Sequence, residues 1–127
     1  MPLSAAPMHG FVPVSSGDRA IAFYRDVLGL RLVANTPFAA VFDVPGGELR
    51  CAITPAFTPQ PFTVIGWQVD DIAVAMADLA RKAISFERFD GLPQDETGVW
   101  NTPDGARICW FKDPDGNVLS LMQPPPT

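Results

Sequence analysis

The sequence predicts an α+β domain of 127 residues, built from two tandem βαβββ modules that form a curved sheet with a concave ligand cleft. Two observations support this prediction. A strand-like stretch followed by a helix-like stretch occurs twice, and an offset of 55 residues superimposes the copies, pairing His9 with Val64. Between the copies, residues 55–61 contain three of the 14 prolines. The pattern indicates an internal duplication, and a fold of two similar halves would hold a ligand between them.

The first predicted module spans residues 8–54 and consists of a strand, a helix and three further strands. Residues 9–14 alternate as a strand does, and the serines that follow can cap a helix. Apolar residues then recur at helical spacing up to Gly29, where the helix is expected to end; they are Ala20, Phe23, Tyr24 and Val27. Short apolar segments between Pro- and Gly-containing turns predict strands at 30–35, 38–44 and 48–54.

The second predicted module spans residues 62–123, after a linker at 55–61 and before a tail at 124–127. Prolines lack the N–H that strand pairing needs, so the proline cluster predicts a linker. A strand at 62–69 leads into a helix capped by Asp70 or Asp71, with apolar residues at Ile72, Ala75, Met76 and Leu79. The remaining predicted elements are strands at 84–89, 107–112 and 118–123, a long loop at 90–104 and a tight turn at 113–116.

Composition excludes several classes of partner. The chain has 9 Lys and Arg against 14 Asp and Glu, a net charge of -5, so it offers no basic field for nucleic acid. No apolar run approaches the roughly 18 to 20 residues that cross a bilayer, and residues 1–8 lack the features of a signal peptide. We therefore expect a soluble, cytoplasmic protein without a membrane partner. The two cysteines, Cys51 and Cys109, have no CxxC spacing and are predicted to be buried, reduced thiols.

Two stretches resemble a known family. Residues 23–30 (FYRDVLGL) and 110–121 (WFKDPDGNVLSL) look like the first-helix and last-hairpin signatures of the vicinal oxygen chelate superfamily, and residues 69–72 (VDDI) add a third match. That superfamily includes glyoxalase I, bleomycin-resistance proteins, fosfomycin-resistance transferases and extradiol dioxygenases. The resemblance covers residues 9–123 and implies a glyoxalase/bleomycin-resistance-like fold and a homodimer. These motifs are architectural, so function has to be argued from the concave faces of the sheets.

The resemblance also implies where a metal would bind. Metal-using members take His or Glu ligands from equivalent strands of the two modules. His9 lies fifteen residues before Tyr24, which matches the first-strand ligand position, and it is the only histidine of the chain. Its repeat partner is Val64, and Ser120 stands where the last strand usually carries a glutamate.

The remaining ligand position lies in the strand predicted at 48–54, where Cys51 or Ala52 falls and Glu48 stands at the start. One imidazole without convergent carboxylates cannot hold Zn, Ni, Fe or Mn tightly. We therefore expect no cofactor and no metal ligand set, with His9 as the only matching ligand position. The alternative is a metal-dependent lyase, isomerase or dioxygenase of the same superfamily that uses His9 in a degenerate site.

Strand alternation predicts a mostly apolar ligand surface with a few hydrogen-bonding groups. Trp100 is suited to stacking on a flat ligand, and Arg50 is suited to binding an anionic group. The predicted ligand-binding residues are Phe11, Arg50, Cys51, Gln68, Trp100, Ser120 and Met122.

Two residues are candidates for acid or base chemistry. His9 changes charge near neutral pH. Glu96 lies in the loop 94–101, which is long enough to fold over the mouth of a cleft and remove water from this carboxylate. The leading hypothesis is nevertheless a protein that binds, and thereby sequesters, a small, largely apolar organic molecule. An enzyme with a degenerate metal site is the second hypothesis, and an accessory module without a ligand is the third.

Overall fold

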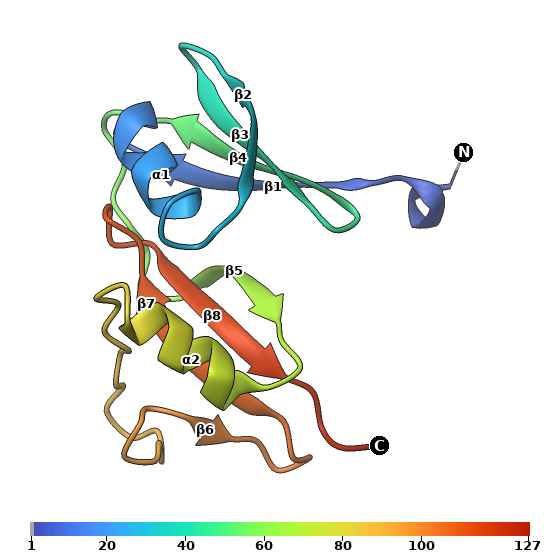
Figure 1. Cartoon of the computed structure of the whole chain (residues 1–127), viewed down its shortest axis with the longest axis vertical. Coiled ribbons are helices and arrows are strands. Elements are labelled where there is room, and N and C mark those ends of the chain that lie inside the picture. Colours follow the sequence, from blue (N-terminus) through green and yellow to red (C-terminus); the bar gives the residue numbers. More distant parts are fainter. Residues whose placement is uncertain (1) are drawn as a thin grey trace. The chain divides into compact units, whose positions relative to one another are not determined.

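The computed structural model describes residues 2–127, and the chain divides between Thr58 and Pro59 into two compact units. This boundary lies inside the predicted linker. Each unit contains a four-stranded sheet with a helix packed against it (Figure 1). Within the described residues, no helix combines the length and the apolar character needed to cross a bilayer.

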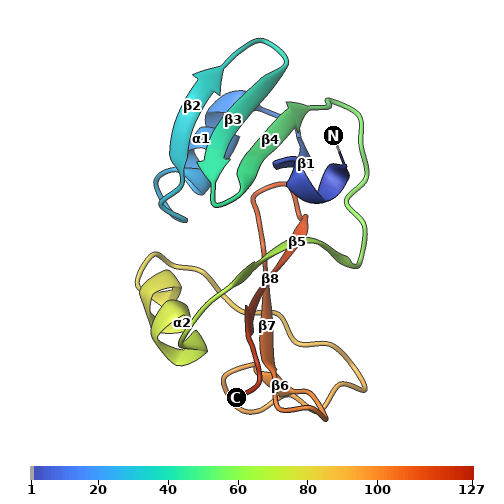
Figure 2. The same cartoon turned by 90° about the vertical axis from the view of Figure 1, so that its right-hand side faces the viewer.

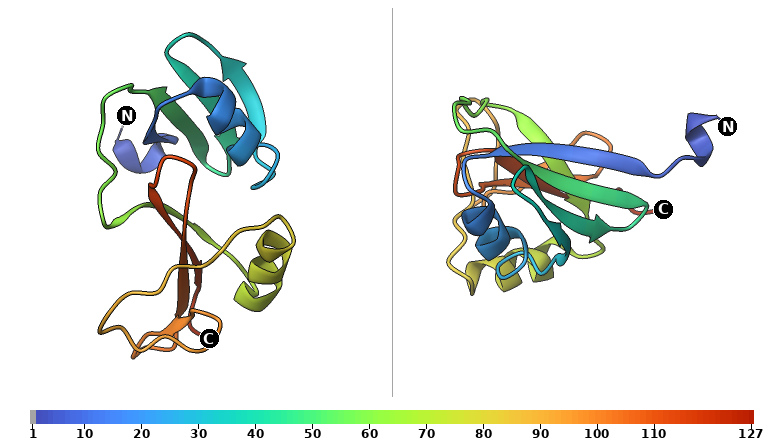
Figure 3. Two further views of the ribbon diagram at one scale, coloured as in Figure 1. Left: turned by 90° about the vertical axis from the view of Figure 1, so that its left-hand side faces the viewer. Right: turned by 90° about the horizontal axis from the view of Figure 1, so that it is seen from above.

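Unit 1, which ends at Thr58, begins with a short 3-10 helix, Leu3–Ala5. Its other elements are β1 (Met8–Val14), α1 (Gly17–Tyr24), β2 (Arg31–Asn35), β3 (Ala39–Val44) and β4 (Gly47–Ile53). The strand order is β1-β4-β3-β2, with β1 parallel to β4 and the other pairs antiparallel. Helix α1 covers one face of this sheet, as Figure 2 shows from one side and the left view of Figure 3 from the other.

Helix α1 begins as the sequence predicts but ends earlier. The Ser16 hydroxyl accepts a hydrogen bond from the Arg19 N–H at 3.3 Å and so caps the first turn. The helix ends at Tyr24, whose ring packs 5.9 Å from that of Phe42 between centroids. The following turns end at Gly29, which has a φ of +79°. A glycine at positive φ therefore closes the turns after the helix, five residues beyond the last helical residue.

Unit 2, which begins at Pro59, repeats the same plan. It contains β5 (Thr63–Gln68), α2 (Ile72–Ala80), β6 (Trp100–Asn101), β7 (Arg107–Lys112) and β8 (Val118–Gln123). The strand order is β5-β8-β7-β6, and β5 is parallel to β8 just as β1 is to β4. The Asp71 carboxylate caps α2 by accepting from the Val74 N–H at 3.2 Å. Two tandem βαβββ modules are thus confirmed.

The strand predicted at 84–89 is wrong. Only Phe86 forms a bridge, to Phe111, and the edge of the sheet is instead β6, inside the predicted loop. The reason is the Gln94 side chain, which accepts from the Phe89 N–H at 2.8 Å and donates to the carbonyl oxygens of Glu87 and Gly98. A side-chain amide therefore satisfies backbone groups that a strand would have paired with β7.

The predicted turn between β7 and β8 is confirmed. The Asp113 carboxylate accepts from the backbone N–H groups of Asp115 and Asn117, each at 2.9 Å, and from the Asn117 amide at 2.9 Å. Gly116 completes the turn with a φ of +88°. Asp113 and Asn117 are both buried, so this motif serves the architecture of unit 2.

Candidate functional site

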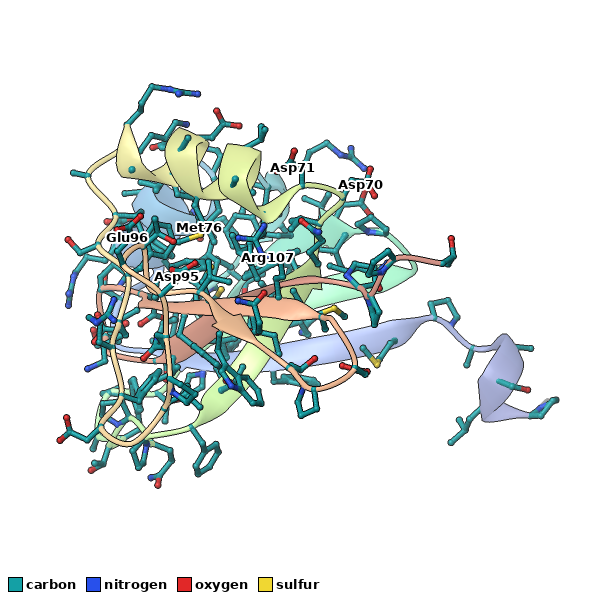
Figure 4. All side chains as sticks on the ribbon, turned by 90° about the horizontal axis from the view of Figure 1, so that it is seen from below. Asp70, Asp71, Met76, Asp95, Glu96 and Arg107 are labelled. Carbon is teal, nitrogen blue, oxygen red and sulfur yellow. The ribbon has the colours of Figure 1, made fainter. Side chains whose placement is uncertain are left out.

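The two faces of the sheet in unit 2 differ in chemistry. Residues directly opposite one another on paired strands share a face. One face carries Leu119, Leu121, Cys109 and Phe111, all at most 5% exposed. It packs under α2, from which Met76 points toward the sheet (Figure 4). The other face we call the aromatic face; it consists of Gly66, Gln68, Trp100, Ile108, Trp110, Ser120 and Met122, all partly or fully exposed.

Two tryptophans dominate the aromatic face. The Trp110 indole N–H donates to the Thr63 hydroxyl at 3.0 Å. Because β8 lies between β7 and β5, this bond holds the indole across β8. The Trp100 ring lies nearly parallel to it, with centroids 6.4 Å apart and planes 26° apart, and Phe89 packs edge-on at 5.4 Å. The arrangement is a fixed aromatic surface of the kind that stacks on planar molecules.

The aromatic face also carries two free polar groups. Among residues 2–127, neither the Ser120 hydroxyl nor the Gln68 amide has a hydrogen-bond partner. Ser120 stands between Gly66 and Trp110 at one register position, and Gln68 stands beside Met122 at the next. Four of the predicted ligand-binding residues, Gln68, Trp100, Ser120 and Met122, therefore lie together on one face.

Trp110 was not among the predicted site residues. It belongs to the stretch 110–121 that carries the family resemblance, and the role expected for that stretch was a structural one. The signal that would have found it is the alternation of β7, which puts Ile108 and Trp110 on the face opposite that of Cys109 and Phe111.

In unit 1, three of the predicted site residues lie on the sheet face away from α1, namely His9, Phe11 and Arg50. Glu48, which was not a predicted site residue, lies on the same face. The His9 and Phe11 rings stack with centroids 6.4 Å apart, and Phe11 is 61% exposed. Glu48 lies directly opposite His9; its carboxylate is 3.9 Å from His9 Nδ1 and 3.7 Å from Arg50 Nη1. We call these four residues the charged face. Only the parallel register of β1 and β4 reveals the contact between His9 and Glu48.

Cys51 does not belong to the charged face, which corrects its prediction as a ligand-binding residue. It lies opposite Val12 and Ala40, and all three are 0% exposed on the side covered by α1. The neighbouring Ala52 shares the face of Arg50 instead. Cys109 is equally buried, and this burial raises the pKa of its thiol to about 12. The Cys109 thiol therefore stays protonated at neutral pH and is a poor nucleophile.

Glu96 is exposed, so the removal of water expected around this carboxylate is not found. It lies in a turn at 95–98 that the neighbouring Asp95 organises, and Figure 4 shows both residues on the loop. The Asp95 carboxylate accepts from the Thr97 hydroxyl at 2.6 Å and from the Val99 N–H at 2.9 Å. These hydrogen bonds lower the pKa of Asp95. Of these two neighbouring acidic residues, Asp95 therefore stabilises the turn and Glu96 is solvated.

The residues present do not fit the metal centre of the metal-using relatives. Among residues 2–127, no group of three or more His, Cys, Asp and Glu side chains is placed to hold a metal ion. The charged face offers His9 and Glu48, and the aromatic face offers only neutral, weakly donating groups, the Ser120 hydroxyl and the Gln68 amide among them. A tightly held divalent metal needs more strongly donating ligands than these.

Comparisons with known proteins agree with this architecture. A family model described as Glyoxalase/Bleomycin resistance protein/Dioxygenase superfamily matches residues 7–121. The comparison with curated proteins gives no match.

Several solved structures share the fold. A superfamily member from Sphaerobacter thermophilus DSM 20745 superimposes with a TM-score of 0.74 at 23% identity, covering 94% of this chain and 98% of that one. A lactoylglutathione lyase from Agrobacterium tumefaciens gives 0.72 at 21% identity, covering 94% and 93%. TnmS3, an antibiotic binding protein from Streptomyces sp. CB03234, gives 0.69 at 24% identity, covering 94% and 96%. At these identities the likeness establishes the fold alone.

Proposed function

The chain belongs to the Glyoxalase/Bleomycin resistance protein/Dioxygenase superfamily, and we propose that it is a member that binds a small, largely apolar organic molecule without a metal centre. The observation that carries this proposal is the aromatic face. The rings of its two tryptophans are nearly parallel, with planes 26° apart, and the hydrogen bond to Thr63 fixes the orientation of Trp110. A preorganised aromatic surface binds planar molecules at little cost in conformational entropy.

Two further points support the proposal. Ile108 and Met122 extend the surface with apolar side chains that are only half-buried. The structural neighbour TnmS3 is an antibiotic binding protein, so the same fold serves small-molecule binding in another chain. By binding the molecule, the protein would sequester it. The homodimer and the cytoplasmic location expected from the sequence stay predictions, which sedimentation and cell fractionation test.

Calorimetric titration with a panel of planar aromatic compounds, namely naphthalene, quinoline and acridine, tests this proposal. We expect at least one compound to bind, and Trp100→Phe to weaken its binding by about three- to fivefold because stacking area is lost. The matched control is Trp67→Phe, which changes the third tryptophan, opposite Leu121 on the side of α2. Absence of binding across the panel, or equal weakening by both variants, would contradict the proposal.

One observation favours a second candidate function, a metal-dependent enzyme with a degenerate site. His9 and Glu48 lie opposite each other, with 3.9 Å between Nδ1 and Oε2. Elemental analysis of protein purified without a histidine tag distinguishes the two functions. Stoichiometric Zn, Ni, Fe or Mn that is lost in both His9→Ala and Glu48→Gln would establish the metal site and overturn the metal-free proposal.

A further inference from the structure

The structure assigns Ser120 the role of a specificity-determining residue, and we infer that the ligand is a planar aromatic molecule that carries a hydroxyl group at its edge. This inference rests on the proposed function, because it names the class of molecule that the aromatic face accepts. It is carried by three neighbours at one register position: Gly66 on β5, Ser120 on β8 and Trp110 on β7.

Gly66 leaves the Ser120 hydroxyl uncovered. A Cβ atom at residue 66 would lie 2.2 Å from Ser120 Oγ and 3.1 Å from the Ser120 carbonyl oxygen. The hydroxyl therefore occupies the space where any other residue would place its side chain. Gly66 itself is exposed, so this oxygen is reached from solvent over the glycine. A larger residue at position 66 would have to displace the hydroxyl.

Trp110 flanks the hydroxyl on its other side and provides stacking without polarity. The only N–H group of its indole ring already donates to the Thr63 hydroxyl. A planar molecule lying on the Trp110 indole would reach Ser120 with its edge, because the two residues are directly opposite on adjacent strands. The Ser120 hydroxyl is then a hydrogen-bonding group at that edge.

The chemistry of the remaining groups favours a hydroxyl on the ligand. The other tryptophan of the face, Trp100, offers an N–H that can only donate. The Gln68 amide oxygen can also accept, but Gln68 lies one register position farther along, beside Met122. A ligand hydroxyl that donates needs an acceptor, and Ser120 Oγ, without a hydrogen-bond partner among residues 2–127, supplies one at the edge of the stack. A ligand without any hydrogen-bonding group at this edge would cover the Ser120 hydroxyl and leave it unpaired. The expected discrimination is about five- to tenfold in Kd.

Naphthalene and 2-naphthol test the inference, because they share one ring system and differ by one hydroxyl. The unmodified protein should bind 2-naphthol about five- to tenfold more tightly than naphthalene. This order is opposite to that of their hydrophobicity, so unspecific apolar binding would not produce it. Ser120→Ala should weaken 2-naphthol alone and remove the preference. Ser85→Ala, a change of the same size at an exposed position outside the strands, is the matched control and should preserve it.

Gly66→Ala provides a second variant. The added methyl group would push the Ser120 hydroxyl out of its position without removing it from the protein. It should also reduce the preference for 2-naphthol, while circular dichroism verifies that the variant is folded. If both compounds bind but the preference is absent, or survives in Ser120→Ala, the inference is overturned and the proposed function stands. If neither compound binds although quinoline or acridine does, the inference is likewise overturned, and if no compound of the panel binds, the proposed function itself fails.

Discussion

The Trp110 indole is held by one hydrogen bond that bridges two strands which are not neighbours. Thr63 lies on β5 and Trp110 on β7, with β8 between them. The bond limits rotation of the ring, so the stacking surface exists before any ligand arrives. Preorganisation of this kind contributes to affinity because less side-chain freedom is lost on binding. Thr63 is therefore a positioning residue for the aromatic face.

Replacing Thr63 by valine removes the acceptor and keeps the shape of the side chain. We expect binding of planar aromatic compounds to weaken by about threefold, because the indole gains rotational freedom. Thr63→Ser keeps the hydroxyl and should bind as the unmodified protein does. Calorimetric titration measures the affinity, and acrylamide quenching of tryptophan fluorescence reports the mobility of the ring. Equal affinities for the valine and serine variants would show that the hydrogen bond has no part in binding.

The faces on which the candidate site residues lie were predictable to the extent that strand register was predictable. The faces of Phe11, Gln68 and Ser120 follow from alternation, because each strand begins close to where the sequence places it. Cys51 and Ala52 are adjacent, so an uncertainty of one residue exchanges the covered face for the open one. The structure places Ala52 on the open face. Glu48 could not be recognised as a neighbour of His9 without the parallel pairing of β1 with β4.

The segment between α2 and β7 owes its course to side-chain hydrogen bonds. The Gln94 amide bridges Glu87, Phe89 and Gly98, and the Arg88 guanidinium donates to the carbonyl oxygens of Gln94 and Asp95. These bonds hold the loop that leads into β6 and so support Trp100. The loop therefore contributes to the placement of Trp100 at the start of β6.

Gln94→Ala tests this account of the loop. Three hydrogen bonds are lost and the backbone groups they served are left without these partners, so the free energy of unfolding should fall by about 1 to 3 kcal/mol. Amide hydrogen exchange of residues 87–99 should accelerate more than that of β7 and β8. Glu96→Gln, an isosteric change at an exposed site of the same loop, should leave stability within about 0.5 kcal/mol. Unchanged exchange in Gln94→Ala would contradict the assigned role.

Periodicity and turn residues located most elements, and the exceptions have identifiable causes. The strands 107–112 and 118–123 were predicted with the bounds that the structure gives. The tight turn at 113–116 fixes the end of the first strand and the start of the second. The strand at 84–89 was predicted from apolar content, which cannot reveal that Gln94 would take the hydrogen bonds. Residue type is thus more informative for turns than for edge strands.

Across the whole chain, the two units have the same order of elements and the same parallel pairing of first and last strands. Their open faces nevertheless differ. Unit 1 presents the charged face, with one histidine, one arginine and one carboxylate around Phe11, and unit 2 presents the aromatic face. The repeated architecture was visible in the sequence as the 55-residue offset. The difference in chemistry depends on the residues at matched positions, of which His9 and Val64 are one pair.

NMR mapping of backbone amides during titration of ¹⁵N-labelled protein with 2-naphthol tests whether the aromatic face is the ligand-binding surface. We expect the largest shift changes at Gly66, Trp110 and Ser120, with small changes in α2. Largest changes at His9, Phe11 and Glu48, on the charged face, or no changes at saturating 2-naphthol, would contradict it.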